Sequence, residues 1–234
     1  MKKIAAWLYK NPALLFLVFT VIAFLPVLLP FFHVKNDLVT QILPTRFIIS
    51  ESLHSGFFPW WNHYINYGIP QYSDMNCGFW NPILWIIAIF FHYNIWTITY
   101  EELFYIFLSG WGIYLVLKDL RVSKNISILG GFSYMCSGYI LGHMQHFCWI
   151  TGAAFLPFVF LYFIRINKNP ELKNLLTGAV FTFFFISSSH PGLIIGAIYF
   201  FVLSFLAIVL SKKIFQRTGL HPAFVKNNFL FFSL

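Results

Sequence analysis

The chain contains 234 residues, of which 59% are hydrophobic and 9% are charged, and its 15 Lys and Arg exceed its seven Asp and Glu to give a net charge of +8. Charge this sparse excludes a soluble domain of this length. Apolar runs near the roughly 18–20 residues that cross a bilayer favour an all-α, polytopic transmembrane helical bundle. The positive charge does not indicate a nucleic-acid partner, because membrane proteins collect Lys and Arg in their cytoplasmic loops. The three cysteines match no disulfide framework and no metal-binding pattern.

Residues 12–32 are predicted to form the first transmembrane helix. The run is longer than the roughly 7–15 residues of a signal-peptide core, and no cleavage site follows it, so we expect the helix to be retained. Lys2, Lys3 and Lys10 precede it. Because basic residues favour the cytoplasmic side, the N-terminus is predicted to be cytoplasmic.

Residues 33–98 are predicted to form a long extracytoplasmic loop. The apolar run within it, residues 82–91, rises only about 15 Å as a helix, which is half the thickness of the hydrocarbon core. We therefore expect this run to be a re-entrant or interfacial segment. Residues 99–210 are predicted to hold five further transmembrane helices, and residues 1–234 to form a single transmembrane domain. The five helices are expected at about 99–117, 126–142, 148–164, 174–189 and 193–210.

The basic residues after position 98 support this count of six crossings. If residues 82–91 do not cross the membrane, three basic clusters fall on the cytoplasmic side, whereas a crossing there places all three outside, against the positive-inside rule. The clusters are Lys118/Arg121/Lys124, Arg165/Lys168/Lys173 and Lys212/Lys213/Arg217.

The predicted topology gathers polar and aromatic side chains on the outer side, most densely in residues 56–70 (GFFPWWNHYINYGIP). Flat rings can stack on the CH groups of a sugar while amides bind its hydroxyls, so this segment is a candidate sugar-binding surface. The alternative for each ring is an ordinary aromatic side chain at the membrane interface. The candidates are Trp60, Trp61, Asn62, Tyr64 and Tyr67.

The order of motifs in this outer region resembles that of YfhO-type bacterial membrane proteins. Residues 36–44 have the pattern Asn-Asp-x-x-x-Gln-x-x-Pro, residues 56–62 have Gly-x-x-Pro-x-Trp-Asn, and Gly-Ile-Pro follows at 68–70 and Gly-Phe-Trp-Asn-Pro at 78–82. Ser189-His190-Pro191-Gly192 with Tyr199 is similar to a Gly-His-Pro-Gln…Tyr element of that family, with Ser for Gly and Gly for Gln. The YfhO-type proteins in turn resemble the GT-C superfamily of glycosyltransferases that use polyprenyl-phosphate sugars.

The resemblance implies transfer of a sugar from a polyprenyl-phosphate donor to a cell-envelope acceptor, on the extracytoplasmic face of the bacterial inner (cytoplasmic) membrane. It implies that Asp37 is the general base, with Gln41, Arg46 and the aromatic segment as substrate-binding residues. A base must be ionised and within hydrogen-bond reach of the acceptor hydroxyl. The alternative for Asp37 is a helix N-cap, because an apolar-periodic run follows it.

The leaving phosphate needs positive charge, which Arg46, Lys35 or a bound divalent metal ion can supply. Imidazoles and a carboxylate are reasonable ligands for such a metal, and the alternative for the histidines is hydrogen bonding at the membrane interface. The candidate ligands are Asp74, His143, His146 and His190.

Two other functions fit the same pattern: a transporter or flippase component, and a non-catalytic membrane assembly subunit. A transporter usually carries ionisable groups at the bilayer midplane, whereas the acids here lie at the outer ends of the predicted helices. Proteins of the YfhO type are usually several times longer, and residues 229–234 look like the start of another helix. We therefore expect the chain to be a fragment or a truncated gene product.

Overall fold

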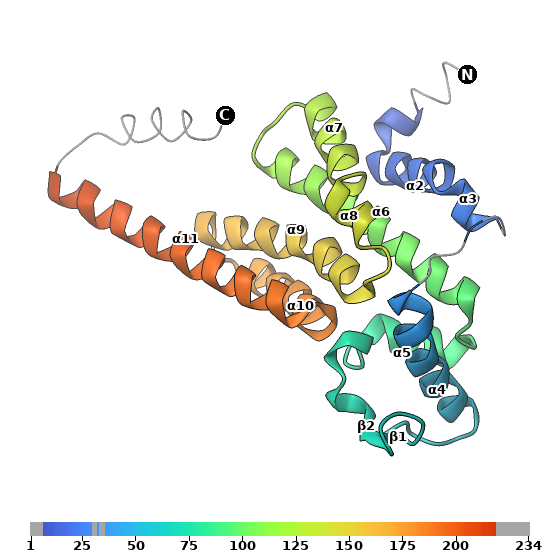
Figure 1. Cartoon of the computed structure of the whole chain (residues 1–234). Coiled ribbons are helices and arrows are strands. Elements are labelled where there is room, and N and C mark those ends of the chain that lie inside the picture. The colour runs from blue at the N-terminus through green and yellow to red at the C-terminus, as the bar shows by residue number, and fades with distance from the viewer. Residues whose placement is uncertain (1–6, 30–31, 33–35, 219–234) are drawn as a thin grey trace. The chain divides into compact units, whose positions relative to one another are not determined.

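The computed structural model describes residues 7–29, 32 and 36–218, and the fold of these residues is almost entirely helical (Figure 1). The β structure of the described residues is one antiparallel pair of short strands, β1 (Trp61–Asn62) and β2 (Ile69–Pro70). The all-α class predicted from composition is therefore confirmed. The main helices are α2 (Pro12–Ala23), α3 (Leu25–Leu28), α4 (Leu43–His54), α5 (Pro82–Phe90), α6 (Ile95–Asp119), α7 (Lys124–Met135), α8 (Gly138–Gly142), α9 (Phe147–Lys168), α10 (Leu172–Ser188) and α11 (Pro191–Thr218).

Two of the predicted continuous helices are interrupted, which corrects the sequence analysis. The helix predicted over 12–32 breaks at Phe24, because Pro26 has no N–H with which to continue the hydrogen-bond ladder, and α3 ends at Leu28. The helix predicted over 126–142 breaks between α7 and α8. Ser137 caps the new helix there, its hydroxyl accepting a hydrogen bond of 3.3 Å from the N–H of Ile140.

Helix α6 lies at the centre of the part of the chain up to Pro191. Helices α2, α7 and α9 pack directly against it, and α10 packs against α9 (Figure 1). The approach of α6 to α7 is close because glycines face each other: a Cβ added at Gly131 would lie 2.6 Å from the carbonyl oxygen of Gly110. Small residues at a helix interface allow backbones to meet in this way. Phe16 of α2 fills the adjoining space and is fully buried.

By length and composition, two helices of the described residues are able to cross a membrane, namely the segments Phe147–Lys168 and Pro191–Ser211. Helices Pro12–Ala23 and Leu172–Ser188 are apolar but shorter. Residues from Gly192 onward form a separate unit, in which α11 is a single long helix. These helices fit a membrane protein, and the six crossings and their orientation stay predictions.

The segment predicted as a long outer loop is a folded layer in its own right. A π-helical turn, Leu38–Ile42, runs directly into α4, and the β1–β2 hairpin, two short 3-10 turns (Gln71–Ser73 and Met75–Cys77) and α5 follow. The short apolar run expected at 82–91 is α5, which Asn81 caps by accepting a hydrogen bond from the N–H of Ile83. We refer to residues 36–94 as the outer layer, after the extracytoplasmic side predicted for them. This layer lies at the end of α6 where that helix begins (Figure 1).

Candidate active site at the N-terminus of α9

Asp37 stands at the start of the outer layer and faces the turn between α8 and α9. Its backbone is helical and its side chain makes no capping hydrogen bond, so the helix-cap alternative does not describe it. One carboxylate oxygen accepts a hydrogen bond of 3.3 Å from the side-chain amide of Gln41. The other lies 3.6 Å from Nε2 of His146, with the two side chains 43% and 34% exposed. A partly exposed carboxylate beside an imidazole is a pair able to exchange a proton with a bound hydroxyl.

A hydrogen bond between Asn36 and Gln145 lies next to the Asp37–His146 contact. The side-chain amide of Asn36 donates a hydrogen bond of 2.5 Å to the side-chain oxygen of Gln145. Consecutive residues of the outer layer thus meet consecutive residues of the α8–α9 turn. Both contacts join segments 109 positions apart in the chain, so this geometry depends on the packing of the outer layer against α9.

The three candidate histidines gather around the first turn of α9. The ring of Trp149 stacks on that of His190 with centroids 4.4 Å apart, and the ring of His143 lies 5.2 Å from Trp149. His143 and His146 have centroids 5.6 Å apart. The backbone N–H of His190 donates to the carbonyl of Cys148, which fixes the end of α10 against α9. Trp149, which the sequence analysis did not single out, is therefore the ring that connects these imidazoles.

Asp74, the fourth candidate metal ligand, lies at the same end of α9. Its carboxylate accepts a hydrogen bond of 3.0 Å from the N–H of Asn76, and the side-chain oxygen of Asn76 is 3.7 Å from the sulfur of Cys148. Asp37 and Asp74 are both within electrostatic range of that cysteine. Even so, in the part of the chain that the structure describes, no three His, Cys, Asp or Glu side chains are arranged to hold a metal ion.

The aromatic segment forms a hairpin away from this site. Asn62 is fully buried, and its side-chain oxygen accepts a hydrogen bond from the N–H of Tyr64, so it supports the hairpin. The backbone at Gly68 has a φ of +111°, and an added Cβ there would lie 2.4 Å from the indole nitrogen of Trp61. Figure 1 shows the hairpin beyond the C-terminal end of α4, whereas Asp37 precedes the N-terminal end of that helix. The exposed rings of the hairpin are Trp60, Trp61, Tyr64 and Tyr67.

Arg46 points into the protein interior. It is fully buried and forms an ion pair with Glu101 of α6. Burial alone lowers the pKa of Arg46, but Glu101 and the neighbouring Tyr93 and Tyr105 raise it above its ordinary value, so the guanidinium stays charged. The guanidinium carbon Cζ of Arg46 also lies 4.3 Å from the ring centroid of Phe147, the first residue of α9. Arg46 therefore stabilises the start of α9 from the protein interior and does not line the site itself.

A buried polar network surrounds this ion pair, and the sequence analysis did not find it. The hydroxyl of Tyr93 donates 2.8 Å to Glu101, the hydroxyl of Tyr105 donates 3.2 Å to the same carboxylate, and the side-chain amide of Asn81 donates 2.8 Å to Tyr105. Burial raises the pKa of Tyr93. The available signal was the pair of acids, Glu101 and Glu102, near the start of an otherwise apolar helix, because acids in such a helix usually need a buried partner.

No family model, curated protein or solved structure matches the chain. The resemblance to YfhO-type proteins and to the GT-C superfamily therefore depends on the sequence motifs alone.

Proposed function

We propose that this protein is a membrane glycosyltransferase-like enzyme of the GT-C type, which transfers a sugar from a polyprenyl-phosphate donor to a cell-envelope acceptor. The observation that carries the proposal is the state of Asp37. Its carboxylate is not used to cap a helix, it is partly exposed, and it lies 3.6 Å from the imidazole of His146. It also belongs to the motif over residues 36–44 on which the family resemblance depends.

In the proposed reaction, Asp37 accepts the proton of the acceptor hydroxyl as that oxygen attacks the anomeric carbon of the donor sugar. The bond between the anomeric carbon and the phosphate oxygen breaks, and polyprenyl phosphate leaves with the bonding electrons. Gln41 holds the carboxylate in place through its 3.3 Å hydrogen bond. His146, on the other side of the carboxylate, is placed to orient it or to pass its proton on.

The leaving phosphate is assigned to the imidazoles at the start of α9. Arg46 has no exposed surface and already pairs with Glu101, which argues against direct contact between its guanidinium and a phosphate. Lys35 lies outside the described residues. His143 and His190 flank Trp149 next to His146, and their protonated forms can neutralise a developing phosphate charge. Because no three side chains of the described part are arranged to hold a metal ion, no step is assigned to one.

The aromatic hairpin is assigned to more distant sugar units. Helix α4 has 12 residues and therefore rises about 18 Å, which is longer than one sugar. A monosaccharide at Asp37 cannot also reach the hairpin, whereas an acceptor of several sugars can. Stacking on exposed rings then binds the distal end of such an acceptor through Trp60, Trp61, Tyr64 and Tyr67.

The proposal includes a membrane placement: a multi-pass protein of the bacterial inner membrane with a cytoplasmic N-terminus and an extracytoplasmic outer layer. Two helices able to cross a membrane support it, as does the distribution of basic residues.

A transporter or flippase component is the second candidate. It is favoured by Glu102 of α6, which is fully buried and whose carboxylate has no hydrogen-bond partner among the described residues. Buried acids in membrane helices often mark transport or proton pathways. A non-catalytic assembly subunit is the third.

The test is transfer of radiolabelled sugar from polyprenyl-phosphate donors by membranes that contain the protein, expressed from its complete reading frame. Loss of a general base typically lowers a rate by about 10²–10⁴, so Asp37→Asn should reduce transfer by that factor while membrane insertion is unchanged. The matched control is Glu171→Gln, an exposed acid before α10. Transfer by the Asn variant at the parental rate would show the mechanism to be wrong. Absence of transfer, together with Glu102-dependent proton or solute uptake in proteoliposomes, would favour the transporter.

A further inference from the structure

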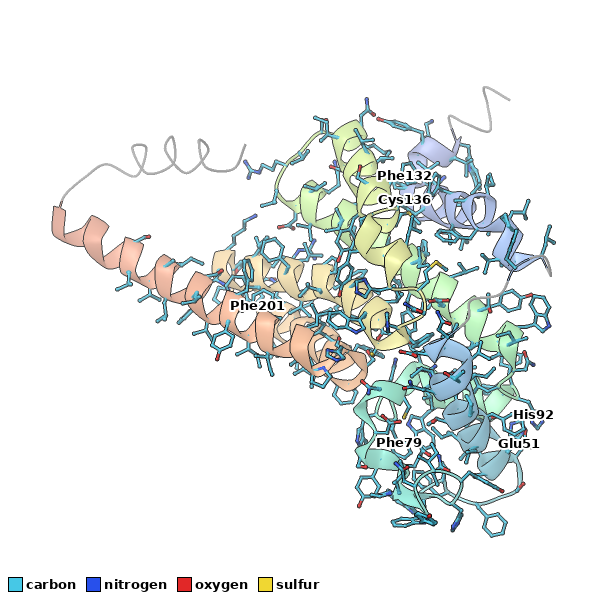
Figure 2. All side chains as sticks on the ribbon, in the orientation of Figure 1. Glu51, Phe79, His92, Phe132, Cys136 and Phe201 are labelled. Atoms are coloured by element: carbon cyan, nitrogen blue, oxygen red, sulfur yellow. The ribbon has the colours of Figure 1, made fainter. Side chains whose placement is uncertain are left out.

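Two histidines meet at the C-terminal ends of α4 and α5, at the opposite end of α4 from Asp37. His54 is the last residue of α4, and His92 follows α5 by two positions. Nδ1 of His54 and Nε2 of His92 are 2.7 Å apart. Figure 2 shows His92 next to Glu51 at the edge of the outer layer, and Nδ1 of His92 is 2.5 Å from that carboxylate. All three side chains are exposed or partly exposed.

The other nitrogen of each histidine faces a group that only accepts hydrogen bonds. Nε2 of His54 is 3.1 Å from the backbone carbonyl oxygen of Ile89, and Nδ1 of His92 faces the ionised carboxylate of Glu51. Each of these nitrogens must therefore carry a hydrogen. In a neutral imidazole, the remaining nitrogen then has a lone pair. The two nitrogens that are 2.7 Å apart thus direct lone pairs at each other, and a positive charge is needed between them.

We propose that His54 and His92 bind a divalent transition-metal ion, with Zn²⁺ or Ni²⁺ as the chemical type, through Nδ1 and Nε2 respectively. A proton can also occupy this gap, and it is the competing occupant. The metal is favoured because each outer N–H is held by an acceptor, the carboxylate of Glu51 for His92 and the carbonyl of Ile89 for His54. Metal-binding histidines have this arrangement, in which the outer partner orients the ring and increases its basicity.

The geometry needs only a small adjustment. Zn–N bonds are about 2.0–2.1 Å long, so two tetrahedral ligands lie about 3.3 Å apart, and the nitrogens must separate by roughly half an ångström. The exposed surface of both rings permits this movement and leaves the other coordination positions to water or to an incoming ligand. The site is separate from the Asp37 site and does not rest on the proposed glycosyltransferase function.

The experiment is calorimetric titration of the purified protein in detergent with Zn²⁺ at pH 7.5. Binding of one ion should be lost in His54→Asn and in His92→Asn, and retained in His63→Asn, which removes an exposed histidine of the hairpin. Glu51→Gln keeps both ligands but weakens the orientation of His92, so affinity should fall about 10–100-fold. The affinity should also fall at pH 5.5, because the ligands must be neutral to bind.

Circular dichroism of each variant separates loss of the site from loss of the fold. Because Glu51→Gln and His63→Asn keep both proposed ligands, their contrast tests the outer partner even if a ligand variant unfolds. Two results would overturn the proposal: no Zn²⁺ binding by the parental protein, or equal affinity in the parental protein and the His54→Asn variant. In the first case, an imidazolium signal from His54 or His92 in ¹⁵N NMR would identify the proton as the sole occupant.

Discussion

Arg46 of α4 and Glu101 of α6 form an ion pair with no exposed side-chain surface, although 55 positions separate them in the chain. The pair connects the outer layer to the central helix. Tyr93 and Tyr105 donate to the same carboxylate, so each oxygen of Glu101 has a partner. Removing one partner of a buried ion pair destabilises a fold strongly, because the remaining charge is left buried without compensation.

We predict that Glu101→Ala lowers the free energy of unfolding by about 3–5 kcal/mol, because it leaves the Arg46 charge buried without a partner. The double variant Arg46→Met/Glu101→Leu should recover a large part of this loss, since no charge is then buried. Thermal unfolding in detergent measures both. Glu171→Ala, at an exposed acid, is the control. Equal losses in Glu101→Ala and Glu171→Ala would mean that the ion pair does not hold the layer in place.

The contact between α6 and α7 gives a second prediction. Gly131→Ala would place a Cβ 2.6 Å from the carbonyl oxygen of Gly110, so one backbone must move, at a cost of about 1–3 kcal/mol. Gly142→Ala in α8 is the matched control, because no atom beyond its chain neighbours and its own helix backbone lies within 4 Å of its added Cβ. That variant should unfold at the parental temperature or slightly above it, as Ala favours a helix over Gly. Identical melting temperatures for the two variants would contradict the close approach of the helices.

The thiol of Cys77 gives a pH-dependent prediction. Burial, and to a lesser degree Asp74, raise the pKa of Cys77 to about 12. The thiolate is the reactive form, so at pH 8 only about one molecule in 10⁴ is reactive, and labelling by a maleimide should be about 10³-fold slower than for an ordinary cysteine. Because the pKa is raised, the rate should increase about tenfold per pH unit up to that pKa. Ser55→Cys, at an exposed position, is the control for mass-spectrometric detection.

Rapid labelling of Cys77 at pH 8 in the folded protein would show that the 3-10 turn Met75–Cys77 is not packed as described. Labelling of Cys77 after the protein is unfolded in detergent confirms that the thiol can react with the maleimide once it is exposed. Cys77 is therefore also a reporter for packing of the outer layer, because loosening of the layer would expose the thiol and remove the burial that raises its pKa.

The predicted topology is tested with membrane-impermeant thiol reagents on intact cells. Ser123→Cys lies at the start of α7 among the basic residues Lys118, Arg121 and Lys124, so it should label only after permeabilisation. Tyr67→Cys, at the fully exposed tip of the hairpin, should label without it. Labelling of Ser123→Cys from outside the cell would contradict the six-crossing count.

The sequence alone determined the helical class and the approximate position of most helices. The short run predicted at 82–91 is α5, and the helices predicted at about 99–117, 148–164 and 174–189 lie at α6, α9 and α10 to within a few residues. Hydropathy and proline act locally, so a pattern of adjacent residues is enough to indicate them. The breaks at Phe24 and Ser137 were missed although Pro26 and Ser137 are local signals, because both runs remain apolar across the break.

Tertiary structure decided which polar residues share a site. Sequence analysis placed Arg46 and the aromatic hairpin with Asp37 as substrate-binding residues, but packing buries Arg46 against Glu101 and places the hairpin at the other end of α4. It places His146 beside Asp37 and leaves Trp149 between two imidazoles. The physical reason is that these contacts join segments far apart in the chain. They form only when α9 packs on α6 and the Arg46–Glu101 pair joins α4 to α6, and no spacing within one segment encodes that arrangement.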